Sequence, residues 1–426
     1  MVLHRLARAA KSLSAPPRPT LPPRLLTWVP CRTVCALALL AWLCAAPGAG
    51  QAQSRGAAGG ATPNIGVVLM GRFAAFSAPT EFAFPGVPLD DEFRVGPEGF
   101  NLGPVEFDIY GNVDPYLFGR VRLSLTDRGI SAEEAFVQTT ALPLGATAKF
   151  GRFKSGIGYL NAVHRHADDF IEAPLPYLAF LGGQYGDEGA QVRWLAPTVV
   201  FWEFGVESLR GAAYPAGGTR PEAAAAAFMS VGSDIGDSQS WLAGLSRLQT
   251  RTRDRQAVSP SGMAYGYAGE TAVNILHWVW KWAPDGNPRY TDLKLQGEYL
   301  LREEDGQYTL TDPLAGAQTL DLRGVNAAQQ AGWYQQARWK FLERWRVGLR
   351  QSVLAPQQTA RTGAATALLG RDRALTVSSA MLEFDPSEFS FFRLQYSRDD
   401  TDRAAGVNRW YLQYTIALGA HAAHEY

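Results

Sequence analysis

Segments of about ten residues in which apolar and polar side chains alternate recur along the chain from residue 64 onward. In LKLQGEYLL, residues 293–301, the odd positions hold Leu, Leu, Gly, Tyr and Leu, and the even positions hold Lys, Gln, Glu and Leu. A period of two is typical of a β-strand with one apolar face and one polar face. We recognise about sixteen such segments and predict an all-β fold. They are residues 64–73, 105–113, 117–126, 133–141, 146–152, 188–195, 199–208, 225–233, 240–250, 270–282, 290–302, 331–341, 345–353, 375–384, 389–397 and 408–418.

The connections between these segments alternate between short and long. Most of the short ones contain Pro, Gly or Asp, as tight turns require. The short ones are 113–116, 141–145, 195–198, 234–239, 283–288, 342–344 and 385–388, and the others are 74–104, 127–132, 153–187, 209–224, 251–269, 303–330, 354–374 and 398–407. Long external loops and short periplasmic turns are typical of a transmembrane barrel, whereas a soluble sandwich has no reason to sort its loops this way. We therefore predict a single antiparallel transmembrane β-barrel of about 16 strands.

Strand length and hydropathy agree with a barrel that spans a membrane. Ten residues at about 3.3 Å each, tilted by about 45°, cover about 24 Å, close to the apolar band of about 25 Å. After residue 52, no stretch approaches the roughly 18 apolar residues of a membrane-spanning helix. In the segment 293–301 we expect Leu293 and Tyr299 to face lipid, and Lys294 and Glu298 to face the channel.

The N-terminal part of the chain differs from the rest. Its first 52 residues carry six Lys or Arg residues, no Asp or Glu, and an apolar run at 34–46 that is too short to span a bilayer as a helix. All three cysteines of the chain lie there, so the exported protein would not rely on disulfides. We interpret residues 1–52 as a signal peptide cleaved near Ala52, residues 53–63 as a short N-terminal segment and residues 64–426 as the barrel.

The distribution of charge argues against a nucleic-acid partner and favours anions as solutes. Once the basic signal peptide is removed, acidic side chains outnumber basic ones, whereas a nucleic-acid binder is expected to be basic. The inward positions of the strands are nonetheless mainly basic, and a basic wall concentrates anions unless its side chains are merely solvated. The predicted pore-lining residues are Arg72, Arg120, Arg122, Arg193, Lys281, Lys294, Glu298, Arg338, Lys340, Arg346, Arg350 and Arg393.

The segment 153–187 is the longest predicted loop and the third on the external side. A loop of this length usually has a function, and we expect it to fold into the barrel and narrow the channel; the alternative is a surface loop. Tyr177 is one of several aromatic residues suited to pack against the wall. Asp168, Asp169 and Glu172 would face the arginines of the wall across the constriction, which predicts only a weak anion preference.

Two histidines in this loop, His164 and His166, precede Asp168 and Asp169 at a spacing suited to zinc ligands. A second, weaker pair is formed by His421 and His424. Histidines in loops are more often only solvated. Zinc is thus the one cofactor that the sequence suggests, and we expect no other.

Catalytic motifs are missing from the sequence. It contains no G-x-S-x-G, no H-E-x-x-H and no phosphate-binding loop. His277 is the one histidine that we place in a strand, where it would face the lumen. A hydrolase on a barrel would need a histidine beside a serine on an outer face. We therefore expect no enzymatic activity.

Two stretches carry a resemblance to known proteins. AFVQTTALPLGATAKFGRFKSGIGYL, residues 135–160, resembles the phosphate-selective porin O/P superfamily of Gram-negative outer-membrane porins. HRHADDFIEAPLPYLAFLGGQYGDEGAQVRW, residues 164–194, resembles porin-like proteins that are sometimes labelled zinc-regulated TonB-dependent outer membrane receptors. The chain departs from the TonB-dependent pattern, in which a plug domain precedes a larger barrel, because only about ten residues separate Ala52 from the first predicted strand.

The resemblance implies a porin of the bacterial outer membrane that forms a water-filled channel for passive diffusion of small polar solutes. It also implies a homotrimer, contact with membrane lipid and lipopolysaccharide, and recognition of the aromatic C-terminal Tyr426 by the barrel-assembly machinery. Two other functions stay open at this point. One is a specific uptake channel for a metal or metal-chelate that binds at His164 and His166, and the other is a non-conducting barrel that serves as an anchor or adhesin.

Overall fold

The computed structural model describes residues 62–78, 84, 86–127, 129–218, 222–258, 262–312, 316–321, 328–359, 373–401 and 406–419. The predicted signal peptide and most of the segment 53–63 lie outside these residues, as do the second histidine pair and Tyr426. Within the described residues, no helix has the length and apolar character that crossing a membrane would require.

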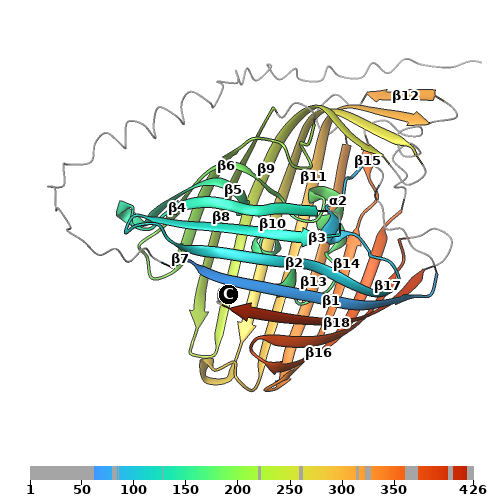
Figure 1. The fold of residues 1–426 in the computed structure, drawn as a ribbon. Coiled ribbons are helices and arrows are strands. Elements are labelled where there is room, and N and C mark those ends of the chain that lie inside the picture. The colour runs from blue at the N-terminus through green and yellow to red at the C-terminus, as the bar shows by residue number, and fades with distance from the viewer. Residues whose placement is uncertain are drawn as a thin grey trace, which may run out of the picture. The chain divides into compact units, whose positions relative to one another are not determined.

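A closed antiparallel barrel makes up most of the described chain (Figure 1). Its strands are β1 (Asn64–Phe76), β2 (Gly99–Asn112), β3 (Leu117–Thr126), β4 (Gly129–Thr139), β5 (Ala146–Lys154), β6 (Gly186–Leu195), β7 (Phe201–Leu209), β8 (Ala223–Ile235), β9 (Gln239–Val258), β10 (Ala264–Trp282), β11 (Asp292–Asp312), β13 (Ala328–Leu342), β14 (Trp345–Leu354), β16 (Leu375–Ser387), β17 (Ser390–Asp399) and β18 (Val407–Gly419). Two further strands, β12 (Gly316–Asp321) and β15 (Gln358–Thr359), only extend the sheet beside β11 and β13.

Closure depends on pairing between the first and last strands. β1 pairs with β18 from Gly66 opposite Gly419 to Phe76 opposite Arg409, and β1 pairs on its other side with β2. Each barrel strand thus has two hydrogen-bonded neighbours, which leaves no open sheet edge. The predicted all-β barrel of sixteen strands is confirmed, and each of the sixteen predicted segments overlaps one barrel strand.

The two faces of the barrel wall have opposite character. Along β18, Leu412, Tyr414 and Ile416 are 50%, 40% and 38% exposed, whereas Gln413 and Thr415 between them are 7% and 5% exposed. Successive side chains of a strand point to opposite faces, so the apolar residues cover the outside and the polar residues line the inside. This is the reverse of a soluble barrel, whose interior is apolar.

Several strands are longer than we predicted, and β2 begins at Gly99, within the predicted loop 74–104. β9 and β10 run through most of 251–269, and β11 continues to Asp312, so the predicted loops at these places are wrong. In this extension the backbone pairing continues while the outward positions become charged, as with exposed Arg251 and Arg253. The alternation on which the prediction depends ends where the apolar band ends, although the hydrogen-bond ladder continues beyond it.

Candidate functional site

The connection between β5 and β6, residues 155–185, folds inside the barrel and is called the inner loop below. It contains one short α-helix, α2 (Leu175–Leu181), which contacts β13, β14 and β16 (Figure 1). Hydrogen bonds join the inner loop to strands all around the wall: β2, β7, β9, β11, β13, β14, β17 and β18. The loop therefore spans the lumen and is held from every side.

Apolar packing explains why the inner loop enters a polar barrel. All seven residues of α2, Leu-Pro-Tyr-Leu-Ala-Phe-Leu, are buried, and Gly182 ends the helix with a φ of 71°, a conformation that favours glycine. The strands that α2 contacts offer apolar inward residues, Tyr334, Leu354 and Val377, and the buried cluster continues along the wall through Leu248, Val273, Ile275 and Leu300. Apolar residues at inward positions, where polar ones are expected, are the sequence signal for the docking place, and our sequence analysis missed it.

Glu298 on β11 holds the middle of the inner loop. Its two carboxylate oxygens accept hydrogen bonds from the backbone N–H groups of Leu160, at 2.8 Å, and Tyr159, at 3.2 Å. They also accept from the hydroxyls of Tyr177, at 2.9 Å, and Tyr334, at 2.8 Å. Burial and the neighbouring Glu298 charge raise the pKa of the Tyr177 hydroxyl well above its ordinary value, so this hydroxyl stays protonated and can donate.

Glu207 on β7 holds the start of the inner loop in a similar way. It accepts hydrogen bonds from the Ser155 hydroxyl and from the Gly156 N–H, the latter at 2.8 Å. Gln191 on β6 donates a third, at 2.7 Å. Wall carboxylates therefore satisfy backbone groups that a loop leaves unpaired when it is buried.

Asp169 connects the inner loop to the wall nearer the turn end of the barrel. Its carboxylate lies 2.5 Å from Nζ of Lys294 and 3.7 Å from Nε of Arg338, and it accepts a hydrogen bond from Gln336 at 2.9 Å. Burial alone would raise the pKa of Asp169, but the charges of Lys294 and Arg338 outweigh it, so the pKa lies below its ordinary value.

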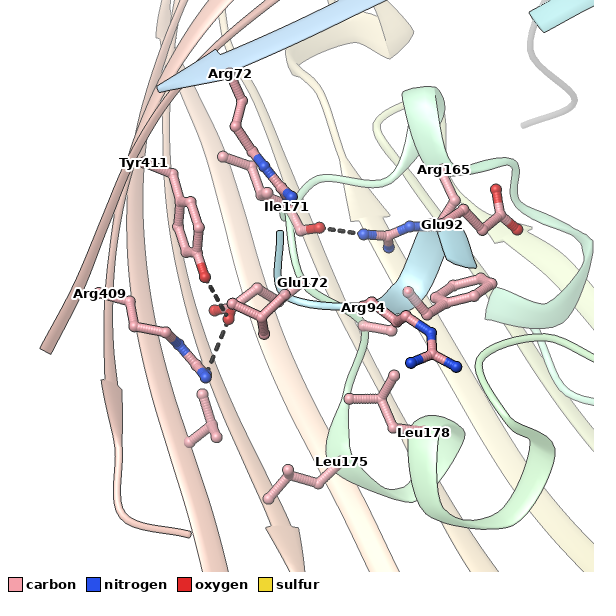
Figure 2. Close-up of a pocket in the computed structure, with 14 residues that line it drawn as sticks. Arg72, Glu92, Arg94, Arg165, Ile171, Glu172, Leu175, Leu178, Arg409 and Tyr411 are labelled. Atoms are coloured by element: carbon pink, nitrogen blue, oxygen red, sulfur yellow. Dashed lines mark hydrogen bonds and ion pairs between the residues drawn. The ribbon is translucent and has the colours of Figure 1, made fainter. Parts of the chain in front are cut away.

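Glu172 connects the loop to the wall near the β1–β18 seam (Figure 2). Its Oε1 lies 2.9 Å from Nη2 of Arg409 and accepts a hydrogen bond from Tyr411 at 3.0 Å, while Gln395 donates to Oε2 at 3.3 Å. Burial alone would raise the pKa of Glu172, but its contacts, chiefly the charge of Arg409, outweigh this effect. The pKa of Glu172 therefore lies below its ordinary value.

The third predicted acid of the loop has a local partner. Asp168 is 3% exposed, pairs with Arg165 at 3.2 Å and accepts a hydrogen bond from the Phe170 N–H at 3.1 Å. We predicted that the three loop acids face arginines of the wall across a constriction. In the structure Asp169 and Glu172 contact cations of the wall directly, whereas Asp168 pairs within the loop.

A small cavity remains where the inner loop, the β1–β2 connection and the wall strands β1, β16 and β18 meet (Figure 2). Its volume is about 20 Å³, enough for about one water molecule. Its charged lining consists of four arginines and two glutamates, and we call it the arginine cavity. These residues are Arg72, Arg94, Arg165, Arg409, Glu92 and Glu172.

The predicted pore-lining residues all lie on barrel strands, and most of those that are basic pair with acids of the wall or loop. Arg350 instead donates to the backbone carbonyl of Glu172 on the inner loop. The ion pairs are Arg120 and Arg122 with Asp108, Arg193 with Glu203, Lys294 with Asp169, Arg338 and Lys340 with Asp292, and Arg346 and Arg393 with Glu383. Most charges of the inner wall are therefore paired.

The two histidines predicted as metal ligands lie together against the wall. The rings of His164 and His166 are stacked with centroids 5.9 Å apart, and Nδ1 of His166 lies 2.9 Å from a carboxylate oxygen of Glu106 on β2. His277 on β10 is buried beside Tyr159 of the inner loop, with ring centroids 6.4 Å apart. It lies on the inner side of the barrel.

No family model matches the sequence. An uncharacterized protein of Aquifex aeolicus (strain VF5) is 32% identical over 351 residues, which cover 77% of this chain and 70% of that protein.

Solved structures resemble the fold at low sequence identity. The loop L8 deletion mutant of OmpT, an outer membrane protein of Vibrio cholerae, gives a TM-score of 0.53 at 12% identity and covers 84% of this chain and 99% of its own. The trimer form of in-vitro folded OmpT gives 0.53 at 10% identity over 84% and 99% of the two chains. The anion-selective porin from Comamonas acidovorans gives 0.50 at 10% identity over the same shares. These likenesses concern the fold.

Proposed function

The chain belongs to the same family as the Aquifex aeolicus protein, and we propose that it is an outer-membrane porin-type channel for passive diffusion of small polar solutes. One observation carries this proposal: a closed barrel with an apolar outer face has a charged inner face. Only a lipid environment outside and a polar medium inside favour that distribution. The likeness in fold to outer-membrane proteins and to a porin supports the same conclusion.

The arginine cavity is, in this proposal, the narrowest point of the channel. It lies between the inner loop and the wall at the β1–β18 seam, and it has room for about one water molecule before any side chain moves. Its lining has four arginines and two glutamates, and because Asp168 and Asp399 pair with Arg165 and Arg409 from beside the lining, most of its positive excess is offset. A positive constriction attracts anions and repels cations, so the channel prefers anions weakly.

The proposal also covers the membrane, the assembly and the oligomeric state of the protein. The apolar outer face contacts membrane lipid and lipopolysaccharide, the barrel-assembly machinery inserts the chain, and three copies form a homotrimer, as in the trimer form of OmpT. The protein acts as a channel and not as an enzyme. Light scattering on the detergent-solubilised protein tests the trimer, since a monomeric mass contradicts it.

Current across a planar bilayer tests the channel. We expect single-channel steps for the purified protein and, under a salt gradient, a reversal potential displaced toward that of the anion. Glu172→Gln removes a negative charge from the arginine cavity and should strengthen the anion preference. Arg72→Gln should weaken it. Arg253→Gln is the matched control, because this arginine side chain is 75% exposed and lies outside the lumen.

Three outcomes contradict the proposal in different ways. A complete lack of steps indicates a non-conducting anchor or adhesin. Steps that one metal or metal-chelate blocks at low concentration indicate a specific uptake channel. Unchanged reversal potentials in both the Glu172 and the Arg72 variants mean that ions pass elsewhere than through the arginine cavity.

A further inference from the structure

A β-bulge in β4 turns two consecutive glutamates toward the interior. Arg122 of β3 lies opposite Glu134 and the next residue, Leu123, lies opposite Ala132, so Glu133 is the extra residue of the bulge. Regular alternation would place one glutamate inside and the other outside. Here both side chains are shielded, at 11% and 8% exposed, and both lie within 4 Å of His164 of the inner loop.

The inner loop brings imidazoles to this bulge. Nδ1 of His164 lies 3.7 Å from a carboxylate oxygen of Glu133, and its Nε2 lies 3.3 Å from one of Glu134. His166 stacks on His164 and contacts Glu106, the inward residue of the neighbouring strand β2. Three carboxylates from two wall strands and two imidazoles from the loop therefore form one cluster.

The spacing within this cluster suits a single ion. One ligand atom each from Glu106, Glu133 and His164 can be chosen so that all three lie within 4.8 Å of one another. Two ligands bound at about 2.1 Å to a tetrahedral ion lie about 3.4 Å apart, so a small rotation of the side chains closes the site. Within the described structure the Oε1 of Glu133 is buried and accepts no hydrogen bond, so it can bind an ion without giving up a partner.

We propose that Glu106, Glu133 and His164, with Glu134 and His166 beside them, bind a divalent transition metal ion. Mixed imidazole and carboxylate ligands favour Zn²⁺ and ions like it over Ca²⁺ or Mg²⁺, which prefer oxygen alone. The ion ties the inner loop to β2 and β4 of the wall, and thereby holds the loop in the lumen.

Lys154 is the internal competitor of this site. Its Nζ lies 3.0 Å from Nδ1 of His164 and 3.9 Å from a carboxylate oxygen of Glu133, so the ammonium group occupies part of the space that the ion needs. Gln184 accepts a hydrogen bond from the same Nζ at 2.6 Å. Binding of the metal displaces the ammonium, and removal of this positive charge should strengthen binding.

Equilibrium dialysis of the detergent-solubilised full chain against Zn²⁺ alone tests the site. We expect one tightly bound ion per chain. Loss of a second-sphere partner typically costs about 10–100-fold in metal affinity, so His164→Ala and Glu133→Gln, which remove ligands, should cost at least about that. Lys154→Met should bind Zn²⁺ more tightly than the unaltered protein. Glu343→Gln, in the turn between β13 and β14 with a side chain 47% exposed, is the control and should leave this affinity unchanged.

Co²⁺ in place of Zn²⁺ gives a second measurement, because the visible absorption of bound Co²⁺ reports nitrogen and oxygen ligands. It is made on the unaltered protein and so requires no variant to fold. The proposal is overturned if no Zn²⁺ binds, or if neither His164→Ala nor Glu133→Gln weakens binding. Weaker binding by Lys154→Met also overturns it. The experiment measures metal binding and not current. The metal site can therefore be disproved without affecting the proposed channel function, and the channel function can be disproved without affecting the metal site.

Discussion

The lumen has two halves that contain the same kinds of side chain in different surroundings. Toward the short turns, Arg193 and Arg346 pair with wall acids but their side chains remain 37% and 23% exposed. Toward the long loops, Arg255 and Arg302 flank Glu304, and all three side chains are at most 4% exposed. Phe180 of the inner loop covers Arg302 and Tyr214 covers Arg255, so loop residues exclude water from this group, whereas toward the turns only pairs packed within the wall, such as Arg393 with Glu383, are equally buried.

The energetic consequences of this difference are large. A buried carboxylate between two buried guanidinium groups cannot be removed without leaving unpaired charge in a medium of low dielectric, which costs about 3–5 kcal/mol. Glu304 also accepts a hydrogen bond from Tyr308, and Arg255 donates to the carbonyl of Pro215 at 2.7 Å. An ion pair in contact with water contributes only about 0–1 kcal/mol.

The largest expected effect follows from that contrast. Glu304→Ala should lower the free energy of unfolding by about 3–5 kcal/mol, because Arg255 and Arg302 lose their shared carboxylate. Glu203→Ala, which removes the partner of the partly exposed Arg193 toward the turns, should cost about 0–1 kcal/mol. Urea unfolding followed by tryptophan fluorescence measures both. Equal midpoints for the two variants would remove the distinction between the halves.

The second prediction concerns a variant with weaker apolar packing between the inner loop and the wall. Leu178 of α2 is 5% exposed and lines the arginine cavity, so Leu178→Ala should cost about 2–5 kcal/mol of packing and enlarge the cavity. We expect a larger single-channel conductance and a lower unfolding midpoint. Leu349→Ala, on the outer face at 66% exposed, is the control and should leave conductance unchanged. A conductance that Leu178→Ala does not change would place the ion path elsewhere.

Chemical labelling compares the water content of the two halves directly. All cysteines of the chain precede residue 52, so a mature protein cleaved near Ala52 offers no background thiol. Arg346→Cys should react with a water-soluble maleimide, whereas Ser352→Cys should not, because Ser352 is 2% exposed and accepts a hydrogen bond from the Leu175 N–H of the inner loop at 2.7 Å. Rapid labelling at residue 352 shows that the loop leaves the wall.

The smallest effect concerns pH. The pKa values of Asp169 and Glu172 are lowered in the folded protein, so the stability that they contribute is present above their unfolded values of about 3.9 and 4.3 and is lost as the pH falls through the lower folded values. We therefore expect the protection of Ser352→Cys from labelling to be the same at pH 7 and pH 5. Adding Asp169→Asn should weaken this protection at both pH values. Loss of protection already at pH 5 contradicts the assignment of these carboxylates as ionised anchors.

The sequence alone determined the barrel, because lipid outside and polar side chains inside impose a local period of two that each strand carries independently. It also marked the segment 153–187 as a loop and His164 and His166 as candidate ligands. Strand ends beyond the apolar band escaped prediction, since Arg251 and Glu270 pair across a ladder that no longer has an apolar face.

Tertiary structure alone decided which inward residues meet. Glu133 joins Glu134 on the inner face only because of a bulge, which a period of two cannot reveal. Glu298 and the N–H of Leu160 lie far apart in the sequence, and they meet only because the inner loop folds into the barrel, where α2 packs on β13, β14 and β16. Such contacts depend on the closure of sixteen strands around one loop, which is a property of the whole barrel and of no segment within it.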